Sequence, residues 1–259
     1  ALLLFASFVS AHIVLPSAAR AAASEGIVLH DTVKKFVRPA QEVREGAEID
    51  WERSVACPLP TLIAEDQCTE VYDESGKKVF YGSYPTLYIE GDAQTPLALA
   101  LAAWSADREE KFAKSAVRRD SEDDRREGRD LVLCYSDIMR IAQWGRIDDQ
   151  MISFFLEGSF YRGGPPPISE AAAVNLDAVT GEKIMLDEIV TSREDLLAAL
   201  AAAFRAQYPG REDETFAQDI EAQLARIHTP YKGLNGFCWY MDADGSLVVH
   251  YINYALAPY

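Results

Sequence analysis

Histidine and carboxylate side chains are the groups of this chain that could carry out acid–base chemistry. His250 lies in an alternating apolar segment, and His228 lies near the end of an expected helix. Either could act as a general acid or base if a partner group lay within hydrogen-bond reach, although a single histidine in a strand is more often a hydrogen-bonded structural residue. The 41 Asp and Glu residues could include a pair for glycoside cleavage, but no spacing singles one out. We therefore predict no catalytic residue.

Motifs for bound metals and cofactors are also missing from the sequence. It contains no His-Glu-x-x-His, no Gly-x-Ser-x-Gly and no glycine-rich phosphate loop. Asp242-x-Asp244-Gly245 begins like a calcium loop, but an apolar Leu-Val-Val run follows where such a loop needs oxygen ligands. A tight turn is the better interpretation of these residues. We expect no cofactor and no metal site.

The stretch from Tyr161 to Pro167 is the most unusual candidate for a binding site. Gly163 and Gly164 free the backbone next to Arg162, and the three prolines that follow hold it extended. The segment could be a rigid connector that leaves a strand, or an exposed recognition edge, because loops carry function more often than cores do. Both interpretations stay open, and the connector is the more conservative one.

Four cysteines predict disulfide bonds in an exported protein: Cys57, Cys68, Cys134 and Cys238. An oxidising compartment lets disulfides persist, and four cysteines allow three connectivities. We favour Cys57–Cys68, which closes a short loop around two prolines, together with Cys134–Cys238. No pair has the spacing of a zinc site.

An apolar run that ends in small residues opens the sequence and has the pattern of a secretory leader. Residues 1–15 are apolar except for two serines and a histidine, and Pro16 then interrupts the run. The segment up to Ala23 contains two Ala-x-Ala steps, the small-residue pattern of a signal-peptidase site. The run is shorter than the about 20 residues of a comfortable membrane-spanning helix. We predict a signal peptide over residues 1–23 and an extracytoplasmic location, periplasmic or secreted; an uncleaved anchor or a buried helix is the alternative.

Net charge limits the partners of the remaining chain. The whole chain carries −16, and residues 1–23 hold one arginine and no acidic residue, so the processed chain would carry −17. Nucleic acids bind mainly through basic side chains, and anionic membrane surfaces also attract basic proteins, so neither is expected as a partner. A basic protein is compatible with this charge, although acidity also serves solubility.

The pattern of apolar residues and turns predicts which elements position these residues. Helices are expected after the capping signals Thr95-Pro96 and Thr191-Ser192-Arg193-Glu194. The expected helices are 96–112, 195–208 and 214–227; the expected strands are two within 77–89 joined by a turn, 130–144, 151–161, 171–176, 183–186, 237–241 and 247–254, with a weaker one at 27–29. Strands in hairpin order with helices inserted between them imply an α+β fold, an antiparallel sheet with helices packed on one face.

Several motifs follow one another in order over residues 159–259. They are Tyr161-x-Gly163-Gly164, Val174-Asn175-Leu176-Asp177-x-x-Thr180-Gly181, Leu186-x-Glu188-Ile189, Gly236-Phe237 and Tyr251-x-x-Tyr254-x-x-Ala257-Pro258-Tyr259. In these residues the chain resembles the RsiV-like extracytoplasmic domain family, which occurs in sigma-factor regulators and in PdaC-type peptidoglycan deacetylases. Tyr84-Pro85-x-Leu87 and the helix after it resemble the domain that usually precedes that family. After the predicted signal peptide at 1–23, the resemblance implies a PdaC/RsiV-type region at 24–147 and an RsiV-like domain at 148–259.

The resemblance implies a binding module of the cell envelope. In RsiV the equivalent region binds lysozyme, a strongly basic enzyme, and a negative charge would favour encounter with such a partner. The candidate ligand-binding residues are Tyr161, Arg162, Gly163, Gly164, Tyr251 and Tyr254.

The sequence also departs from the family pattern. The family continues its Gly-Gly pair with Ala-His, where this chain has Pro165-Pro166, so no role of that histidine is carried over. The family also adds a glycine and a last segment after the position of Tyr259. Neither the deacetylase activity nor sigma-factor binding is transferred.

We therefore predict an exported, non-catalytic protein that contacts peptidoglycan or a basic envelope protein such as lysozyme. One alternative is an enzyme acting on envelope glycans through unassigned carboxylates helped by His250. Another is a structural or oligomeric envelope component, in which an edge strand pairs with a second copy.

Overall fold

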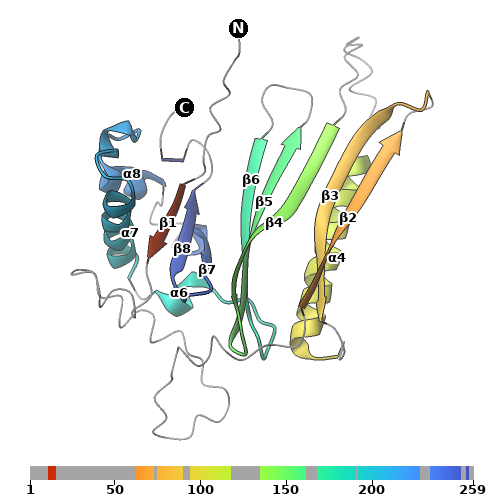
Figure 1. Cartoon of the computed structure of the whole chain (residues 1–259), viewed down its shortest axis with the longest axis horizontal. Coiled ribbons are helices and arrows are strands. Elements are labelled where there is room, and N and C mark those ends of the chain that lie inside the picture. Colours follow the sequence, from red (N-terminus) through yellow and green to blue (C-terminus); the bar gives the residue numbers. More distant parts are fainter. Residues whose placement is uncertain are drawn as a thin grey trace, which may run out of the picture. The chain divides into compact units, whose positions relative to one another are not determined.

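The computed structural model describes residues 11–15, 62–72, 75–89, 94–117, 135–161, 168–190, 192–227, 234–251 and 255–256. The chain forms two compact units (Figure 1). The sheet unit spans Glu52–Lys183, and the C-terminal unit combines Ile184–Tyr259 with Ala1–Trp51. The expected α+β class is confirmed in these elements, which combine two sheets with several helices.

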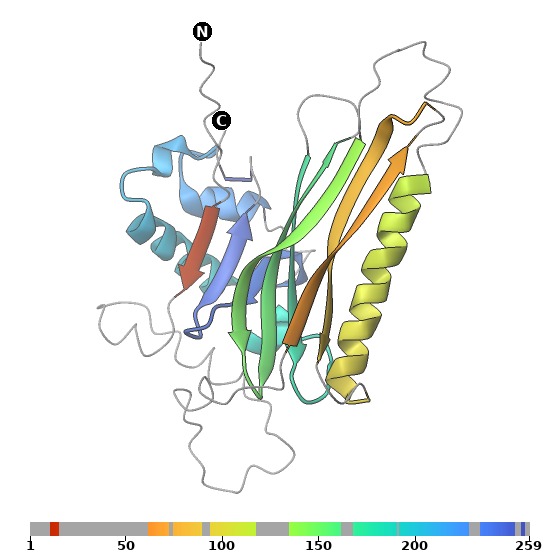
Figure 2. The ribbon, with the colours of Figure 1, turned by 45° about the vertical axis from the view of Figure 1, so that its right-hand side comes forward.

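Five strands form one sheet in the order β2-β3-β4-β5-β6, which is also their order in the sequence. They are β2 (Leu62–Tyr72), β3 (Lys78–Ile89), β4 (Tyr135–Ile147), β5 (Met151–Tyr161) and β6 (Ile168–Asp177). Neighbouring strands are antiparallel except β3 and β4, which are parallel. A parallel pair needs a crossover connection, and helix α4 (Pro96–Val117) lies in that connection and runs alongside the sheet in Figure 2.

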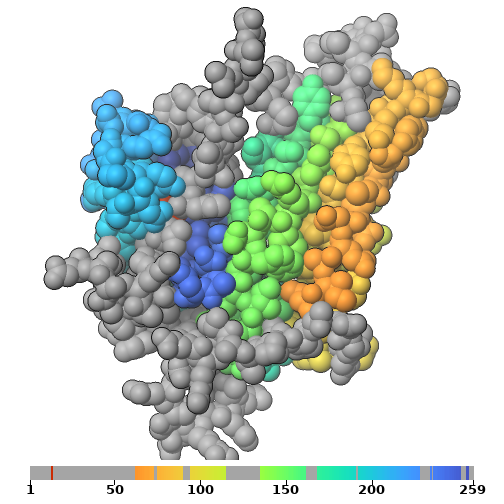
Figure 3. All heavy atoms as spheres, in the orientation of Figure 1, coloured from red at the N-terminus to blue at the C-terminus, as the bar shows by residue number. Residues whose placement is uncertain are grey.

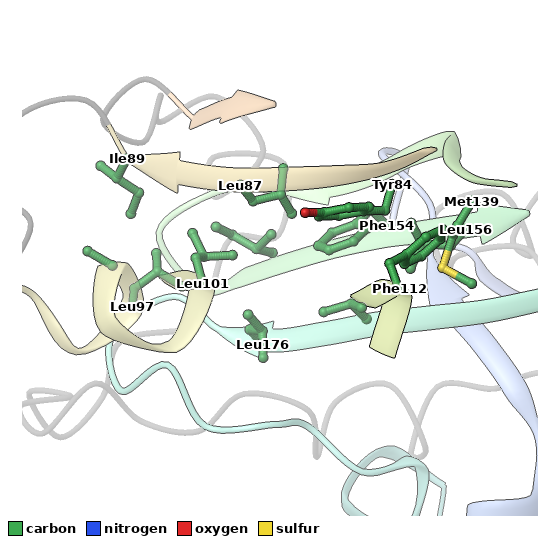
Figure 4. Packing of buried hydrophobic residues seen from close by; sticks show 13 residues of the cluster. Tyr84, Leu87, Ile89, Leu97, Leu101, Phe112, Met139, Phe154, Leu156 and Leu176 are labelled. Carbon is green, nitrogen blue, oxygen red and sulfur yellow. The ribbon is translucent and has the colours of Figure 1, made fainter. Parts of the chain in front are cut away.

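The core of the sheet unit lies between α4 and one face of the sheet (Figure 4). Its buried members are Tyr84, Leu87, Ile89, Leu97, Ala98, Leu101, Phe112, Met139, Ile152, Phe154, Leu156, Val174 and Leu176. Trp104 of α4 meets the Phe154 ring edge-on, with 5.4 Å between the ring centroids. Burying side chains of this size contributes about 1.5–3 kcal/mol each, so this apolar contact holds α4 on the sheet.

Strand β3 is a single strand of 12 residues, so the expected turn within residues 77–89 is wrong. Its pairing with β4 covers only Phe80 to Ser83. Beyond Ser83, the backbone of Leu87 forms hydrogen bonds with Ser105 of α4 instead. The Ser105 Oγ accepts a hydrogen bond from the Leu87 N–H at 2.9 Å and donates one to the Leu87 carbonyl oxygen at 3.2 Å. Pro85 lies in the part of β3 that is not paired with β4, where a missing N–H is tolerated.

The C-terminal unit contains a smaller, antiparallel sheet in the order β1-β8-β7. The strands are β1 (Ala11–Leu15), β7 (Cys238–Met241) and β8 (Leu247–Tyr251); the helices are α6 (Leu186–Ile189), α7 (Arg193–Gln207) and α8 (Ile220–Ile227), with short 3-10 helices at Glu212–Glu214 and Leu234–Gly236. Helix α7 contacts both β1 and α8. The β7–β8 hairpin is confirmed, with Gly245 at φ +78° in its turn.

Strand β1 lies within the residues that the sequence assigns to a leader. Ile13 is fully buried and pairs with Val249 of β8. Removal of the leader would take this strand away from the small sheet. Cleavage of residues 1–23 stays a prediction.

Other elements differ from the sequence-based expectations in detail. Helix α7 begins at Arg193, before the expected start at Asp195, and its cap is Ser192, whose Oγ accepts a hydrogen bond from the Asp195 N–H at 3.1 Å. The helix expected at 214–227 is shorter, because α8 covers only Ile220–Ile227. Residues 183–186 are not a strand, since Lys183 forms one isolated bridge and Leu186 already begins α6.

Two further expectations concern a domain boundary and a strand at residues 27–29. The expected boundary at 147/148 falls between the paired strands β4 and β5, so it differs from the division into compact units. The strand expected at 27–29 lies outside the described residues. Among the described helices, none combines the length and the apolar character needed to cross a bilayer.

Candidate functional site

The β2–β3 hairpin presents tyrosines and carboxylates to solvent. We call Glu65, Glu70, Tyr72, Lys78, Tyr81 and Tyr88 the tyrosine surface. Tyr72 is 53% exposed and Tyr88 41% exposed, and both belong to the few large apolar or aromatic side chains that the described residues leave open. In Figure 3 the atoms of β2 and β3, in orange shades, lie open on the side facing the viewer.

One end of the tyrosine surface is organised by Lys78. Its Nζ donates a hydrogen bond to one Glu70 carboxylate oxygen, and the Tyr72 hydroxyl donates to the other. The same Nζ lies 5.8 Å from the ring centroids of both Tyr72 and Tyr81. A cation within about 6 Å of an aromatic face is attracted to the ring, so Lys78 helps to fix both rings.

Charge pairing sets the ionisation of these groups. The hydrogen bond from Lys78, followed by that from Tyr72, lowers the pKa of Glu70. The hydrogen bond to Glu70 raises the pKa of Tyr72 and that of Lys78. Near neutral pH this end of the surface therefore presents a carboxylate, an ammonium and a neutral phenol held together.

The other end of the tyrosine surface is formed by Tyr88 and Glu65. The Tyr88 hydroxyl donates a hydrogen bond to Glu65 Oε1 at 2.7 Å. Nearby, Gln67 Nε2 donates to Thr86 Oγ1 at 3.3 Å, and Thr86 Oγ1 donates to the Glu65 carbonyl at 3.2 Å. These side chains are tied across the two strands, so their ordering costs less entropy on binding than that of free side chains.

Such a surface is suited to recognition rather than to bond cleavage. Tyrosine offers a large, rigid contact area with a polar tip. Strand β2 adds Glu65, Asp66 and Glu70 without a basic residue, and Lys78 is the one basic residue within β3. The surface can therefore contact an uncharged polar ligand, such as a glycan, or a basic protein.

The residues that the sequence proposes for binding are divided between the two units. Tyr161 ends β5 in the sheet unit, is half-buried and pairs with Ser136. Tyr251 ends β8 in the C-terminal unit and is 3% exposed, and burial raises its pKa. Tyr251 therefore acts as a core residue in this structure. Arg162, Gly163, Gly164 and Tyr254 lie outside the described residues.

Of the residues that carry the family resemblance, Asn175, Asp177 and Gly181 have structural roles. Asn175 accepts a hydrogen bond from the buried Ser153 hydroxyl at 2.6 Å, and Asp177 Oδ1 accepts from the backbone N–H groups of Val179 and Thr180 at 2.9 and 2.8 Å. Gly181 follows at φ +69°. These residues form the end of β6 and the turn after it. This part of the motif therefore stabilises the fold and gives no evidence for a ligand.

The two expected disulfides are not formed in the structure. Cys68 and Cys238 are free thiols, while Cys57 and Cys134 lie outside the described residues. Cys68 is exposed, and its Sγ lies 3.8 Å from the Tyr81 hydroxyl. Cys238 is largely buried, and desolvation raises the pKa of its thiol to about 11. The structure does not show these pairings, which were chosen from cysteine count and loop length, and neither carries distance information.

Histidine and acidic side chains form no metal-binding cluster among the described residues. No set of three or more His, Cys, Asp or Glu side chains in this part of the chain could hold a metal ion. His250 is 5% exposed and pairs in register with Cys238. His30 and His228 lie outside the described residues.

Comparisons with known proteins give structural neighbours only. No protein-family model matches the sequence, and no curated protein matches it. A DUF3298 family protein from Bacteroides fragilis aligns over 62% of this chain and 76% of its own length, with 14% identity and a TM-score of 0.44. A second DUF3298 family protein, from Pseudomonas aeruginosa PAO1, aligns over 59% of this chain and 67% of its own, with 14% identity and a TM-score of 0.40. The structural neighbours thus belong to a domain family of unknown function.

Proposed function

We propose that this protein is an exported, non-catalytic binding protein of the bacterial cell envelope, which contacts peptidoglycan or a basic envelope protein such as lysozyme. The tyrosine surface is the observation that carries the proposal. Its exposed rings are ordered by Glu65, Glu70 and Lys78 before any ligand arrives. The leader pattern and the resemblance to RsiV-like domains support the location and the class of partner.

Charge supports the protein partner through the rate of encounter. The processed chain would carry −17, and complementary charge speeds diffusional association with a basic protein. Because exposed charges are screened over about 8 Å at physiological ionic strength, such binding weakens as salt is added. A glycan ligand would instead bind with little dependence on salt.

Calorimetric titration of the purified protein against lysozyme, and separately against soluble muropeptides, tests the proposal. We expect saturable heat with at least one of them. Tyr72→Ala and Tyr88→Ala should each weaken that binding about tenfold, as for aromatic residues at the centre of an interface.

The control is Phe216→Ala in the C-terminal unit. Phe216 is 43% exposed, and its ring centroid lies 5.3 Å from the Arg226 guanidinium, so the substitution also removes an exposed cation–π contact. Binding should survive this change. No heat with either ligand, or binding that the two tyrosine substitutions leave unchanged, would reject the proposal.

A further inference from the structure

The outer edge of β8 is covered by a strand from the other end of the chain. The register pairs Ala11 with Tyr251 and Leu15 with Leu247. Ile13, Val249 and Trp239 form one row across β1, β8 and β7, and their exposed fractions are 0%, 0% and 6%. The edge of β8 is thus a buried, apolar position that accommodates one more strand.

The present occupant belongs to the segment that processing would remove. If residues 1–23 are cleaved, β8 keeps its partner β7 and loses β1. Its second row of backbone N–H and C=O groups is then unpaired, and Val249 loses the side chain that lies across from it. An open edge with apolar side chains readily pairs with another extended chain.

We infer that the β8 edge of the processed protein is a strand-acceptor site, which binds an extended apolar segment of a partner protein by adding it to the small sheet. The inference rests on the export in the proposed function, because processing would vacate the site. It concerns a different surface from the tyrosine surface, which lies in the sheet unit.

The current occupant shows which chemistry the site accepts. The segment runs antiparallel to β8 and is extended over five residues. Its central residue is a β-branched isoleucine that becomes fully buried. In this mode of recognition the backbone ladder supplies affinity, while alternate side chains supply specificity. A partner segment should therefore carry a large apolar residue at the position of Ile13 and no charge there.

A labelled peptide of residues 9–17 serves as the probe, and its binding to the chain of residues 24–259 is followed by fluorescence anisotropy. We expect saturable binding, weakened at least about tenfold by Ile13→Asp in the peptide, because a charge would be buried without a partner. The unprocessed chain of residues 1–259 is the matched control. Its own β1 fills the site, so it should bind the peptide at least about tenfold more weakly.

Two N-methylated peptides separate strand addition from general apolar binding. One is methylated at residues 11, 13 and 15, and the other at residues 12 and 14. In an antiparallel pair only alternate N–H groups point to the neighbouring strand, so one peptide should lose binding and the other should keep it. Equal binding of the two peptides, or of the two chains, would overturn the inference, as would a stable dimer of the processed chain that the peptide does not dissociate.

Further measurements keep the test decisive. If the chain of residues 24–259 does not fold, Ile13→Asp in the chain of residues 1–259 should open the same site, and this variant should bind the wild-type peptide; no binding there overturns the inference. Titration of lysozyme and muropeptides on the same samples reports separately on the proposed function. If the peptide does not bind but lysozyme or a muropeptide does, only the strand-acceptor site is rejected. If the peptide binds but neither lysozyme nor the muropeptides do, only the proposed function is rejected.

Discussion

The two sheets are assembled from the chain in different ways. Every strand of the five-stranded sheet pairs with its neighbour in the sequence, and the longest connection covers residues 90–134. In the small sheet, β8 pairs with the nearby β7 and with β1, from which residues 16–246 separate it. Loop-closure entropy makes that long connection about 1.5 kcal/mol costlier than the one between β3 and β4. The larger sheet is therefore built from strands that follow one another in the chain, whereas the smaller sheet depends on one pairing between distant segments.

Among the substitutions that test this comparison of the two sheets, Phe154→Ala is expected to have the largest effect. Phe154 is fully buried and contacts both Trp104 and Trp144, at centroid distances of 5.4 and 5.6 Å. Truncating it should lower the free energy of unfolding by about 3–5 kcal/mol. Urea denaturation should show this loss in the transition of the sheet unit.

Leu200→Ala is the matched change in the other unit, because Leu200 of α7 is also fully buried. It should shift only the transition of the C-terminal unit. If both substitutions shifted one common unfolding transition, the two units would not unfold independently, and the comparison between them would fail.

The second prediction concerns the buried thiol of the small sheet. Burial raises the pKa of Cys238 from 9.0 to about 11, so the protonated thiol is favoured in the folded state. At pH 8 its thiolate fraction, and its alkylation rate, should be about 100-fold lower than for the same thiol in urea. The difference should shrink as the pH rises from 9 towards 11.

Mass spectrometry after timed alkylation measures this rate in a variant with Cys57→Ser and Cys134→Ser. Cys68 is the internal control, because it is exposed and should react at similar rates in the folded and unfolded chain. Equally fast labelling of both thiols in the folded protein would show that the small sheet opens readily, which contradicts its tight packing.

A smaller loss is expected at the turn after β6. Gly181 has φ +69°, and a Cβ there would lie 2.6 Å from the Pro96 carbonyl oxygen at the start of α4. Gly181→Ala should cost about 2 kcal/mol, from backbone strain together with this clash. Thermal unfolding of the sheet unit measures the change.

Gly76→Ala separates strain from clash within the same unit. Gly76 also has a positive φ, +81°, but a Cβ there would meet nothing within 4 Å. It should therefore cost only about 1 kcal/mol. Equal losses at both glycines would show that the turn after β6 does not lie against α4.

The smallest effect is expected at the cap of α7. Ser192→Ala removes the acceptor for the Asp195 N–H and should destabilise the C-terminal unit by about 1 kcal/mol. Ser192→Thr keeps a hydroxyl and should recover most of the loss. Chemical denaturation should place this change in the C-terminal transition and leave the sheet unit unaffected.

The sequence-based predictions were correct for elements in which an apolar segment is bounded by a clear turn or capping signal. Strand β5 is a largely apolar segment that covers residues 151–161 as expected, and β6 at 168–177 includes the expected strand 171–176. Helix α4 begins at Pro96 as its Thr-Pro start predicts, with Thr95 Oγ1 accepting a hydrogen bond from the Ala98 N–H at 3.2 Å. Local signals were sufficient for these elements.

Strand β2 was missed for a physical reason. Its sequence LIAEDQCTEVY is polar because it lies at the edge of the sheet with most of its side chains exposed, so it lacks the apolar alternation of a half-buried strand. The tyrosine surface was missed with it, since two of its contacts, Lys78–Glu70 and Tyr88–Glu65, join residues 8 and 23 positions apart across the hairpin. The spaced tyrosines of β3 were visible in the sequence, but their partners on β2 could be found only from the strand register.

The distance between β1 and β8 has a consequence for the order of events during synthesis. At about 5–20 residues per second, roughly 10–50 seconds pass between the appearance of Leu15 and that of Leu247. The larger sheet can close during that interval, because all five of its strands have already left the ribosome. Residues 11–15 are thus made long before the strand with which they pair, and during that interval they stay accessible to other proteins that bind the nascent chain.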